Sequence, residues 1–315
     1  MFFSPKPMHI PDGFINIPVS IVMWVVSVVM IAIALRKTQK QLGEREIPLM
    51  GVLAAAIFAG QMLNFSVTGG TSGHLLGAAL ATLLLGPWAA VLVMTSVVSI
   101  QAILFQDGGI IALGTNLFNM AIVGVFVSYA VFTIIRKVFR NEKAGLFVGA
   151  GLSAWTSIFF ASLACALELA ISGTSPANIA IPAMAGIHAL IGIGEAIITV
   201  GAVSFIYASR KDLVLKNEST RKTSKGILIG GGVIAVILAI LSPLASSHPD
   251  GLEWVAEQKG VLSNAQPAFY NIIPDYVLPG LSNEAVATIL AGIIGASIVF
   301  VVAFSVAKTR KKTIN

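Results

Sequence analysis

The chain is dominated by long apolar runs that charged residues rarely interrupt. Nine such runs can be marked, at residues 17–35, 48–63, 74–85, 87–105, 110–135, 144–171, 183–208, 226–245 and 285–307. A helix that crosses the hydrocarbon layer of a membrane needs about 20 predominantly apolar residues. Charged residues make up only 11% of the chain, against about 25% in an average soluble protein. The sequence therefore predicts an integral membrane protein and excludes a soluble enzyme.

The same runs favour helices over strands. They are continuous rather than alternating, and lipid requires that the backbone hydrogen bonds be made within each spanning segment. The runs at 48–63 and 74–85 fall short of the about 17–25 residues of a typical span. The expected fold class is all-α, a polytopic transmembrane helical bundle of about nine spans in the cell membrane.

The basic residues indicate how this bundle is oriented. All of the 20 lysines and arginines except Lys6 and Lys259 fall into four clusters, at residues 36–45, 136–143, 210–225 and 308–312. With nine spans, all four clusters lie on one side. Cytoplasmic loops are enriched in lysine and arginine, so we expect the N-terminus outside and the C-terminus in the cytoplasm. The basic charge therefore reflects topology and contact with the lipid bilayer, and no nucleic acid partner is expected.

Two units are expected along the chain. Residues 8–210 contain seven spans, 211–225 form a basic cytoplasmic linker, and 226–315 contain two spans. The last two spans flank a long, proline-containing outer loop at residues 246–283, and connectors of that length are usually functional. We expect this loop to contact partner proteins. The single cysteine, Cys165, can form no internal disulfide.

The four histidines are predicted to lie near the outer side. They are His9, His74, His188 and His248. Imidazole is the commonest metal ligand among side chains, although a lone histidine near a helix end is more often an interfacial residue. His74 stands apart because it follows the glycine-rich segment GGTSG at residues 69–73. Glycines permit positive φ and close backbone approach, which suits a loop folded around a small ligand.

The segment MHIPDGF at residues 8–14 can chelate a metal if Met8 is the N-terminal residue. The Met8 amine and the His9 amide nitrogen would close a five-membered ring, and that amide and the His9 Nδ1 a six-membered one. Such rings favour a plane, and His74 is the best candidate to complete four nitrogens. Square-planar nitrogen ligation is typical of Ni(II) or Cu(II). Binding should weaken as the pH falls, because the ligands must lose protons.

These residues also carry a family resemblance. The segments MHIPDGF at 8–14 and GGTSGHLLG at 69–77, together with FQDGG at 105–109, closely resemble the NikM/CbiM family. That family comprises the substrate-capture (S) components of energy-coupling factor transporters for nickel and cobalt. The resemblance extends over residues 8–210. The C-terminal unit, with HPDGLEW at 248–254, resembles the small NikN or PDGLE-type component of these systems, here fused to the first unit.

The resemblance implies a function and a set of partners. Met8, His9 and His74 would correspond to the metal-binding positions, and Ni(II) or Co(II) would be the transported substrate, with no cofactor. The first Pro-Asp-Gly, at residues 11–13, is more similar to the nickel subgroup than to the cobalt one. The partners implied are a transmembrane coupling (T) component and cytoplasmic ATPase subunits. Because seven residues precede Met8, we expect that Met8 is the true start or that a leader is removed.

Other functional classes lack their sequence signals. The chain contains neither a phosphate-binding GxxxxGK[ST] loop nor a zinc-type HExxH motif. It is therefore predicted to be no enzyme, and ATP would be hydrolysed by partner subunits. A stand-alone secondary metal transporter remains as an alternative. It would use ionisable residues within the spans, such as Glu168 and Glu195, the latter forming either a proton relay or a structural hydrogen-bonded pair with His188.

Overall fold

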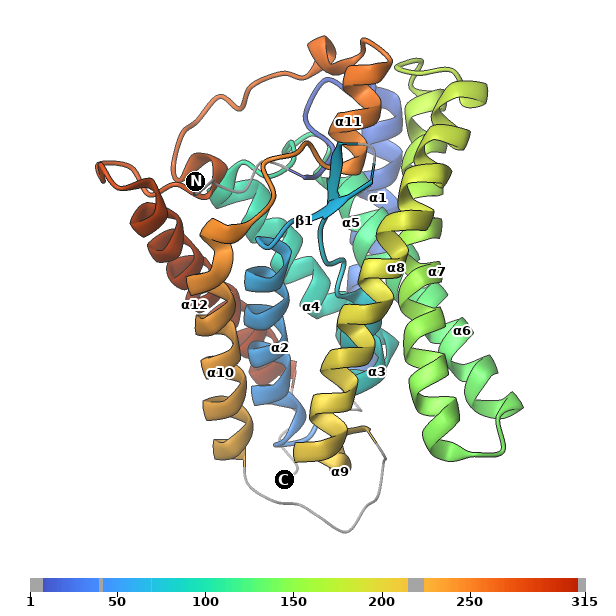
Figure 1. Cartoon of the computed structure of the whole chain (residues 1–315), viewed down its shortest axis with the longest axis vertical. Coiled ribbons are helices and arrows are strands. Elements are labelled where there is room, and N and C mark those ends of the chain that lie inside the picture. Colours follow the sequence, from blue (N-terminus) through green and yellow to red (C-terminus); the bar gives the residue numbers. More distant parts are fainter. Residues whose placement is uncertain (1–7, 40–41, 69, 215–223, 311–315) are drawn as a thin grey trace.

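The computed structural model describes residues 8–39, 42–68, 70–214 and 224–310. These residues form a helical bundle, with short irregular segments gathered at one end (Figure 1). Seven helical segments within the described residues are long and apolar enough to cross a membrane. Along α1 and α8, large apolar side chains such as Val25 and Ile197 are exposed, as expected of a surface that faces lipid. The predicted multi-pass helical membrane protein is confirmed.

The elements follow one another in a simple order. They are α1 (Ile17–Thr38), α2 (Glu46–Gln61), β1 (Phe65–Val67), β2 (Thr71–Gly73), α3 (Ala78–Leu85), α4 (Pro87–Ile100), the π-helix η1 (Gln101–Phe105), α5 (Leu113–Leu117), the π-helix η2 (Phe118–Val123), α6 (Gly124–Val138), α7 (Glu142–Ile171), α8 (Ala177–Ser209), α9 (Lys211–Val214), α10 (Ser224–Leu241), η3 (Ser242–Leu244), α11 (Gly251–Gln258), η4 (Leu262–Asn264), η5 (Pro274–Tyr276) and α12 (Glu284–Arg310). Strands β1 and β2 pair antiparallel as a small hairpin.

The two short apolar runs have different outcomes. The run at 48–63 forms the single helix α2 except for its last two residues. The run at 74–85 forms only the eight-residue helix α3, because residues 74–77 are not helical. Gly77 has a φ of 79°, and the Glu195 carboxylate accepts the backbone N–H groups of Leu76 at 2.7 Å and Gly77 at 3.0 Å. This buried acceptor replaces the hydrogen bonds of the missing helical turn.

The bundle has two chemically different ends. One end, here called the hairpin end, carries the β1–β2 hairpin, α11 and the loop at 245–283 (Figure 1). The described basic residues at 36–37, 45, 136–143 and 210–211 lie at the opposite, basic end. The expected linker begins there as α9, and residues 215–223 lie outside the described part of the chain. The grouping of the basic clusters agrees with the expected arrangement of the spans.

The two C-terminal helices pack on the first unit through small residues. α2 contacts both α10 and α12 (Figure 1). A methyl group placed on Gly51 would lie 2.9 Å from the Phe300 ring, and one on Gly292 would lie 3.2 Å from Met62. Glycine therefore allows these helices to approach closely, as small residues do in membrane bundles.

Candidate metal centre

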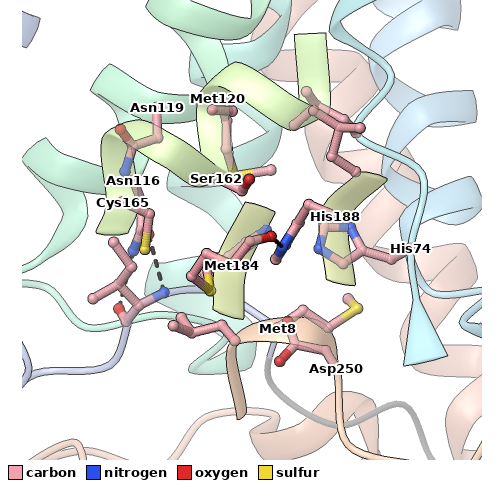
Figure 2. Close-up of a pocket in the computed structure, with 16 residues that line it drawn as sticks. Met8, His74, Asn116, Asn119, Met120, Ser162, Cys165, Met184, His188 and Asp250 are labelled. Atoms are coloured by element: carbon pink, nitrogen blue, oxygen red, sulfur yellow. Dashed lines mark hydrogen bonds between the residues drawn. The ribbon is translucent and has the colours of Figure 1, made fainter. Parts of the chain in front are cut away.

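A small cavity lies at the hairpin end, between the N-terminal segment and the helices below it. Its volume is about 80 Å³, enough for a few water-sized groups. It is lined by Met8, His9, Ile10, His74, Leu76, Asn116, Asn119, Met120, Ile158, Ala161, Ser162, Cys165, Met184, His188, Asp250 and Leu252. Figure 2 shows His74 and His188 on one side of it and Asn116, Asn119 and Cys165 on the other. All three predicted ligand residues, Met8, His9 and His74, thus line one cavity.

Three nitrogens of the N-terminal segment converge on one oxygen atom. The backbone nitrogens of Met8 and His9 donate to Asp107 Oδ1 at 2.6 and 3.1 Å. The Nδ1 atom of His9 lies 3.2 Å from the same oxygen. Met8, His9 and Asp107 are all buried. These are the three nitrogens of the predicted chelate, and they already surround a single point.

The segment after His9 is fixed by the loop that follows η1. The Asn116 side chain holds the backbone of Ile10 from both sides, accepting its N–H at 3.0 Å and donating to its carbonyl at 3.1 Å. The Asp12 carboxylate accepts the N–H groups of Ile110 and Ala112 at 3.1 and 3.0 Å. The Gly109 N–H also donates to the Ile10 carbonyl at 2.9 Å. These bonds join the N-terminal segment to residues 109–116 and fix the position of the candidate ligands Met8 and His9.

Residues Pro11–Gly13 form a turn after the N-terminal segment. Gly13 has a φ of 92°, and Phe14 N–H points back to the Pro11 carbonyl at 3.5 Å. The turn reverses the chain between the cavity and the start of α1, whose N-cap Asn16 accepts the Val19 N–H at 3.0 Å. An N-cap of this kind stabilises a helix start by about 1 kcal/mol. The chain thus enters α1 shortly after the residues that line the cavity.

Gly108 is required where the two segments touch. Its φ is +97°, and a methyl group on it would lie 2.9 Å from His9 Cβ and 2.8 Å from Asn116 Nδ2. We predict that Gly108→Ala lowers metal affinity and destabilises the protein by about 1–2 kcal/mol or more, the usual cost of left-handed backbone without glycine. Gly173→Ala is the matched control, because Gly173 has a φ of +77° but open space around it. Thermal unfolding and metal titration in detergent test this. Equal metal affinity in the two variants would contradict the contact.

His74 is oriented for ligation by its other ring nitrogen. Its Nδ1 lies 3.1 Å from the Leu75 carbonyl, and a proton on Nδ1 leaves the Nε2 lone pair free. The His9 and His74 rings meet edge to face, with centroids 5.7 Å apart. Since Glu195 accepts the backbone N–H groups of Leu76 and Gly77, the segment that carries His74 is fixed two residues further along the chain.

Among the remaining histidines and acidic residues, one expected pair is not formed. His188 lines the cavity, but its Nδ1 bonds to the Met184 carbonyl at 2.9 Å. Glu195 bonds to the backbone of residues 76 and 77, so the expected His188–Glu195 pair is wrong. Helical spacing placed them on one face, but the extended segment before α3 takes up the carboxylate. Glu168 accepts from Asn119 Nδ2 at 2.7 Å and is buried. His248 is exposed and does not line the cavity.

Sequence reasoning missed Asp107, Asn116 and Asp250 as residues of the site. Asp107 is fully buried, although the sequence pointed to it only as part of the FQDGG segment. No local sequence pattern marks its role, because the helices on each side of it set its position. Both η1 and η2 are π-helical, and such widened turns often occur at functional sites. They place Asp107 and Asn116 between them.

A metal in this cavity would need backbone nitrogen. Within the described ranges, no group of three His, Cys, Asp or Glu side chains is placed to hold an ion. The buried Nε2 atom of His9 has no hydrogen-bond partner. The potential metal-ligand atoms at the cavity are imidazole and main-chain nitrogens, and the thioether groups of Met8 and Met184 and the thiol of Cys165 lie nearby. This donor set suits a transition metal rather than Mg²⁺ or Ca²⁺, which prefer oxygen.

The bundle and its cavity define a multi-pass membrane protein with a small-ion-sized pocket near one end. Residues 9–213 match the family model of the cobalt uptake substrate-specific transmembrane region, CbiM. Residues 225–312 match the PDGLE domain. The chain therefore belongs to the CbiM family of transition-metal transport components and carries a PDGLE domain after the CbiM region.

Individual relatives agree with this assignment. A putative fused nickel transport protein NikMN of Archaeoglobus fulgidus is 36% identical over 303 residues, covering 96% of this chain and 98% of the relative. A fused nickel transport protein NikMN of Rhodobacter capsulatus is 32% identical, covering 79% and 76%. A crystal structure of a transition metal transporter aligns with a TM-score of 0.60 and 32% identity, covering 68% of this chain and 100% of that one.

Proposed function

We propose that this protein is the metal-capture component of an ATP-driven energy-coupling factor importer and that it captures Ni(II) at the outer face of the cell membrane. The ion would be held by the Met8 amine, the amide nitrogen and Nδ1 of His9, and the imidazole of His74. Relatives that match both parts of the chain are named as nickel transport proteins, which favours nickel as the substrate.

One observation supports this proposal most directly. The Met8 and His9 backbone nitrogens and His9 Nδ1 lie within 3.2 Å of a single atom, Asp107 Oδ1. Three nitrogens that surround one point can bind one ion with little rearrangement. On metal binding the His9 amide would lose its proton, and the Met8 amine and His9 Nδ1 would turn their lone pairs to the ion. Two fused chelate rings then hold them in a plane.

His74 would complete the plane. Its ring lies 5.7 Å from the His9 ring between centroids, and its Nδ1 contact with the Leu75 carbonyl favours a free Nε2. Four nitrogens in a square favour Ni(II) or Cu(II) over Zn(II), which prefers a tetrahedron. The protein would thus select its cargo by geometry.

Cobalt is the alternative cargo, because the matching family model is described by cobalt uptake. A higher affinity for Ni(II) than for Co(II) would not by itself identify the cargo, because most protein sites bind Ni(II) more tightly. The discriminating measurement is the competition for uptake between the two ions at equal free concentration. We expect nickel to be taken up and cobalt to compete only weakly for uptake.

The orientation and the energy source are part of the proposal. The concentration of basic residues at the end opposite the cavity supports a cytoplasmic basic end and an outer cavity. The sequence contains no phosphate-binding GxxxxGK[ST] loop. Energy would therefore come from a transmembrane coupling (T) component and cytoplasmic ATPase subunits.

Uptake of radioactive nickel into vesicles tests this function. We expect uptake by the full chain only when the coupling component, the ATPases and internal ATP are all present. The control contains an ATPase that cannot hydrolyse ATP. Nickel accumulation by the chain alone would contradict the proposal and favour a stand-alone secondary transporter.

A further inference from the structure

The PDGLE domain folds back onto several segments around the cavity. Its loop between α10 and α12 lies over the hairpin end (Figure 1). The Ser72 N–H of the hairpin donates to the Pro249 carbonyl at 2.8 Å, and Gln266 N–H donates to the Asp12 carbonyl at 2.8 Å. Ile273 N–H donates to the Leu104 carbonyl of η1 at 3.0 Å. These backbone bonds anchor the loop at three places around the site.

The first part of this loop forms a wall of the cavity. Asp250 and Leu252 line it directly, and Asp250 caps α11 by accepting the Glu253 N–H at 2.7 Å. A methyl group on Gly251 would lie 2.9 Å from His188 Cε1, so glycine allows α11 to reach the cavity. Burial raises the pKa of Asp250 well above its usual value. The Pro-Asp-Gly of the loop therefore has a packing role at the site.

The second part of the loop inserts a tyrosine beside the ligands. Tyr276 is fully buried, and its ring stacks on Phe105 with centroids 4.8 Å apart and planes 16° apart. Asp275 and Tyr276 have φ values of 51° and 57°. Two successive non-glycine residues in the left-handed region cost about 1 kcal/mol or more each. The fold tolerates this strain at the point where Tyr276 enters.

The Tyr276 hydroxyl donates a hydrogen bond to Asp107 Oδ2. Burial and the neighbouring Asp107 raise the pKa of Tyr276 well above its ordinary value, so the hydroxyl keeps its proton and remains a donor. The other oxygen of the same carboxylate, Oδ1, is the atom on which the Met8 and His9 nitrogens converge. One side chain thus connects the PDGLE domain to the N-terminal ligands.

We propose that Tyr276 is a positioning residue of the metal site, through which the PDGLE domain holds Asp107 and, through Asp107, the Met8–His9 ligands in place. This inference rests on the proposed capture function. Ligands that are ordered before the ion arrives lose less conformational freedom on binding. A carboxylate fixed by Tyr276 also stays beside the site as a counter-charge once the nitrogens have turned to the metal.

The test compares Tyr276→Phe with Tyr270→Phe in the full chain. Both tyrosines lie in the same loop, but the Tyr270 hydroxyl bonds to the Ala102 carbonyl at 2.8 Å and not to Asp107. Phenylalanine keeps the Tyr276 ring on Phe105. We expect Tyr276→Phe to lower nickel affinity by about 10–100-fold, the usual effect of losing an outer-shell partner. In the metal-free protein it should also speed amide hydrogen exchange at residues 9 and 10. Tyr270→Phe should change neither.

A double-mutant cycle with Asp107→Ala separates positioning from general stability. If Tyr276 acts through Asp107, Tyr276→Phe has no further effect on nickel affinity or exchange once Asp107 is absent. Equal effects in both backgrounds would overturn the proposal, as would wild-type exchange at residues 9 and 10 in Tyr276→Phe. The exchange measurement needs no metal. It therefore tests the positioning even if the wild-type chain fails to bind nickel, a result that would overturn the capture function instead.

Discussion

Replacing His74 by alanine lowers the nickel affinity of the protein by more than about a hundredfold, beyond the 10–100-fold effect of losing an outer-shell partner. In the proposed site, His74 would supply the one ligand that does not come from the N-terminal segment. Its ring lies next to that of His9, with centroids 5.7 Å apart, and the carboxylate of Glu195 accepts the backbone N–H groups of Leu76 and Gly77 just after it. Neither His9 nor Met8 can provide the fourth nitrogen in its place. Calorimetric titration of the purified full chain measures the loss.

His248→Ala is the matched control for this variant. His248 is exposed and lies outside the cavity, so we expect wild-type nickel affinity from it. Thermal unfolding of both variants in the same detergent shows whether His74→Ala remains folded. A folded His74→Ala variant that binds nickel as the wild type does would remove His74 from the ligand set.

A free amine on Met8 raises the nickel affinity by a similarly large factor. A chain that begins at Met8 offers a basic amine to the metal, whereas a chain that keeps residues 1–7 offers an amide nitrogen there. The amine and the adjacent amide close the first chelate ring, and losing one of four ligands costs more than the 10–100-fold seen for outer-shell groups. We expect tight binding only from the chain that begins at Met8, measured by competition with a chelator of known affinity.

Acetylation supplies a close control for that comparison. An acetyl group on Met8 removes the basic lone pair while adding little bulk. The acetylated chain should bind nickel as weakly as the chain that carries residues 1–7. If both bind as tightly as the free amine, the N-terminal nitrogen takes no part in ligation.

The helical bundle could be predicted because its physical cause is local. Nine apolar runs are visible in the sequence, and the residues that end them, such as the clusters at 36–45 and 136–143, are charged. Each of these features is read from neighbouring residues, and the lipid environment permits few alternatives. The candidate ligands Met8 and His9 could be predicted from the sequence for the same reason, because chelation by adjacent residues depends only on local sequence.

The rest of the site depends on contacts between distant residues. Tyr276 and Asp107 are 169 positions apart, and Glu195 lies 119 positions from Leu76. No periodicity links such pairs. The His188–Glu195 pair shows the converse error, because helical spacing put both residues on one face while the nearest unsatisfied N–H groups belonged to another segment. A buried carboxylate is taken by whichever donors the tertiary fold brings to it.

X-ray absorption of the nickel-loaded protein tests the central claim most directly. The geometry of the N-terminal segment and His74 predicts four nitrogen ligands in a square plane. The nickel absorption edge should then show the feature of square-planar coordination, and no shell of oxygen or water ligands should be present. The spectrum should persist in His248→Ala and be lost in His74→Ala. Tetrahedral ligation, or a six-coordinate shell rich in oxygen, would contradict the account.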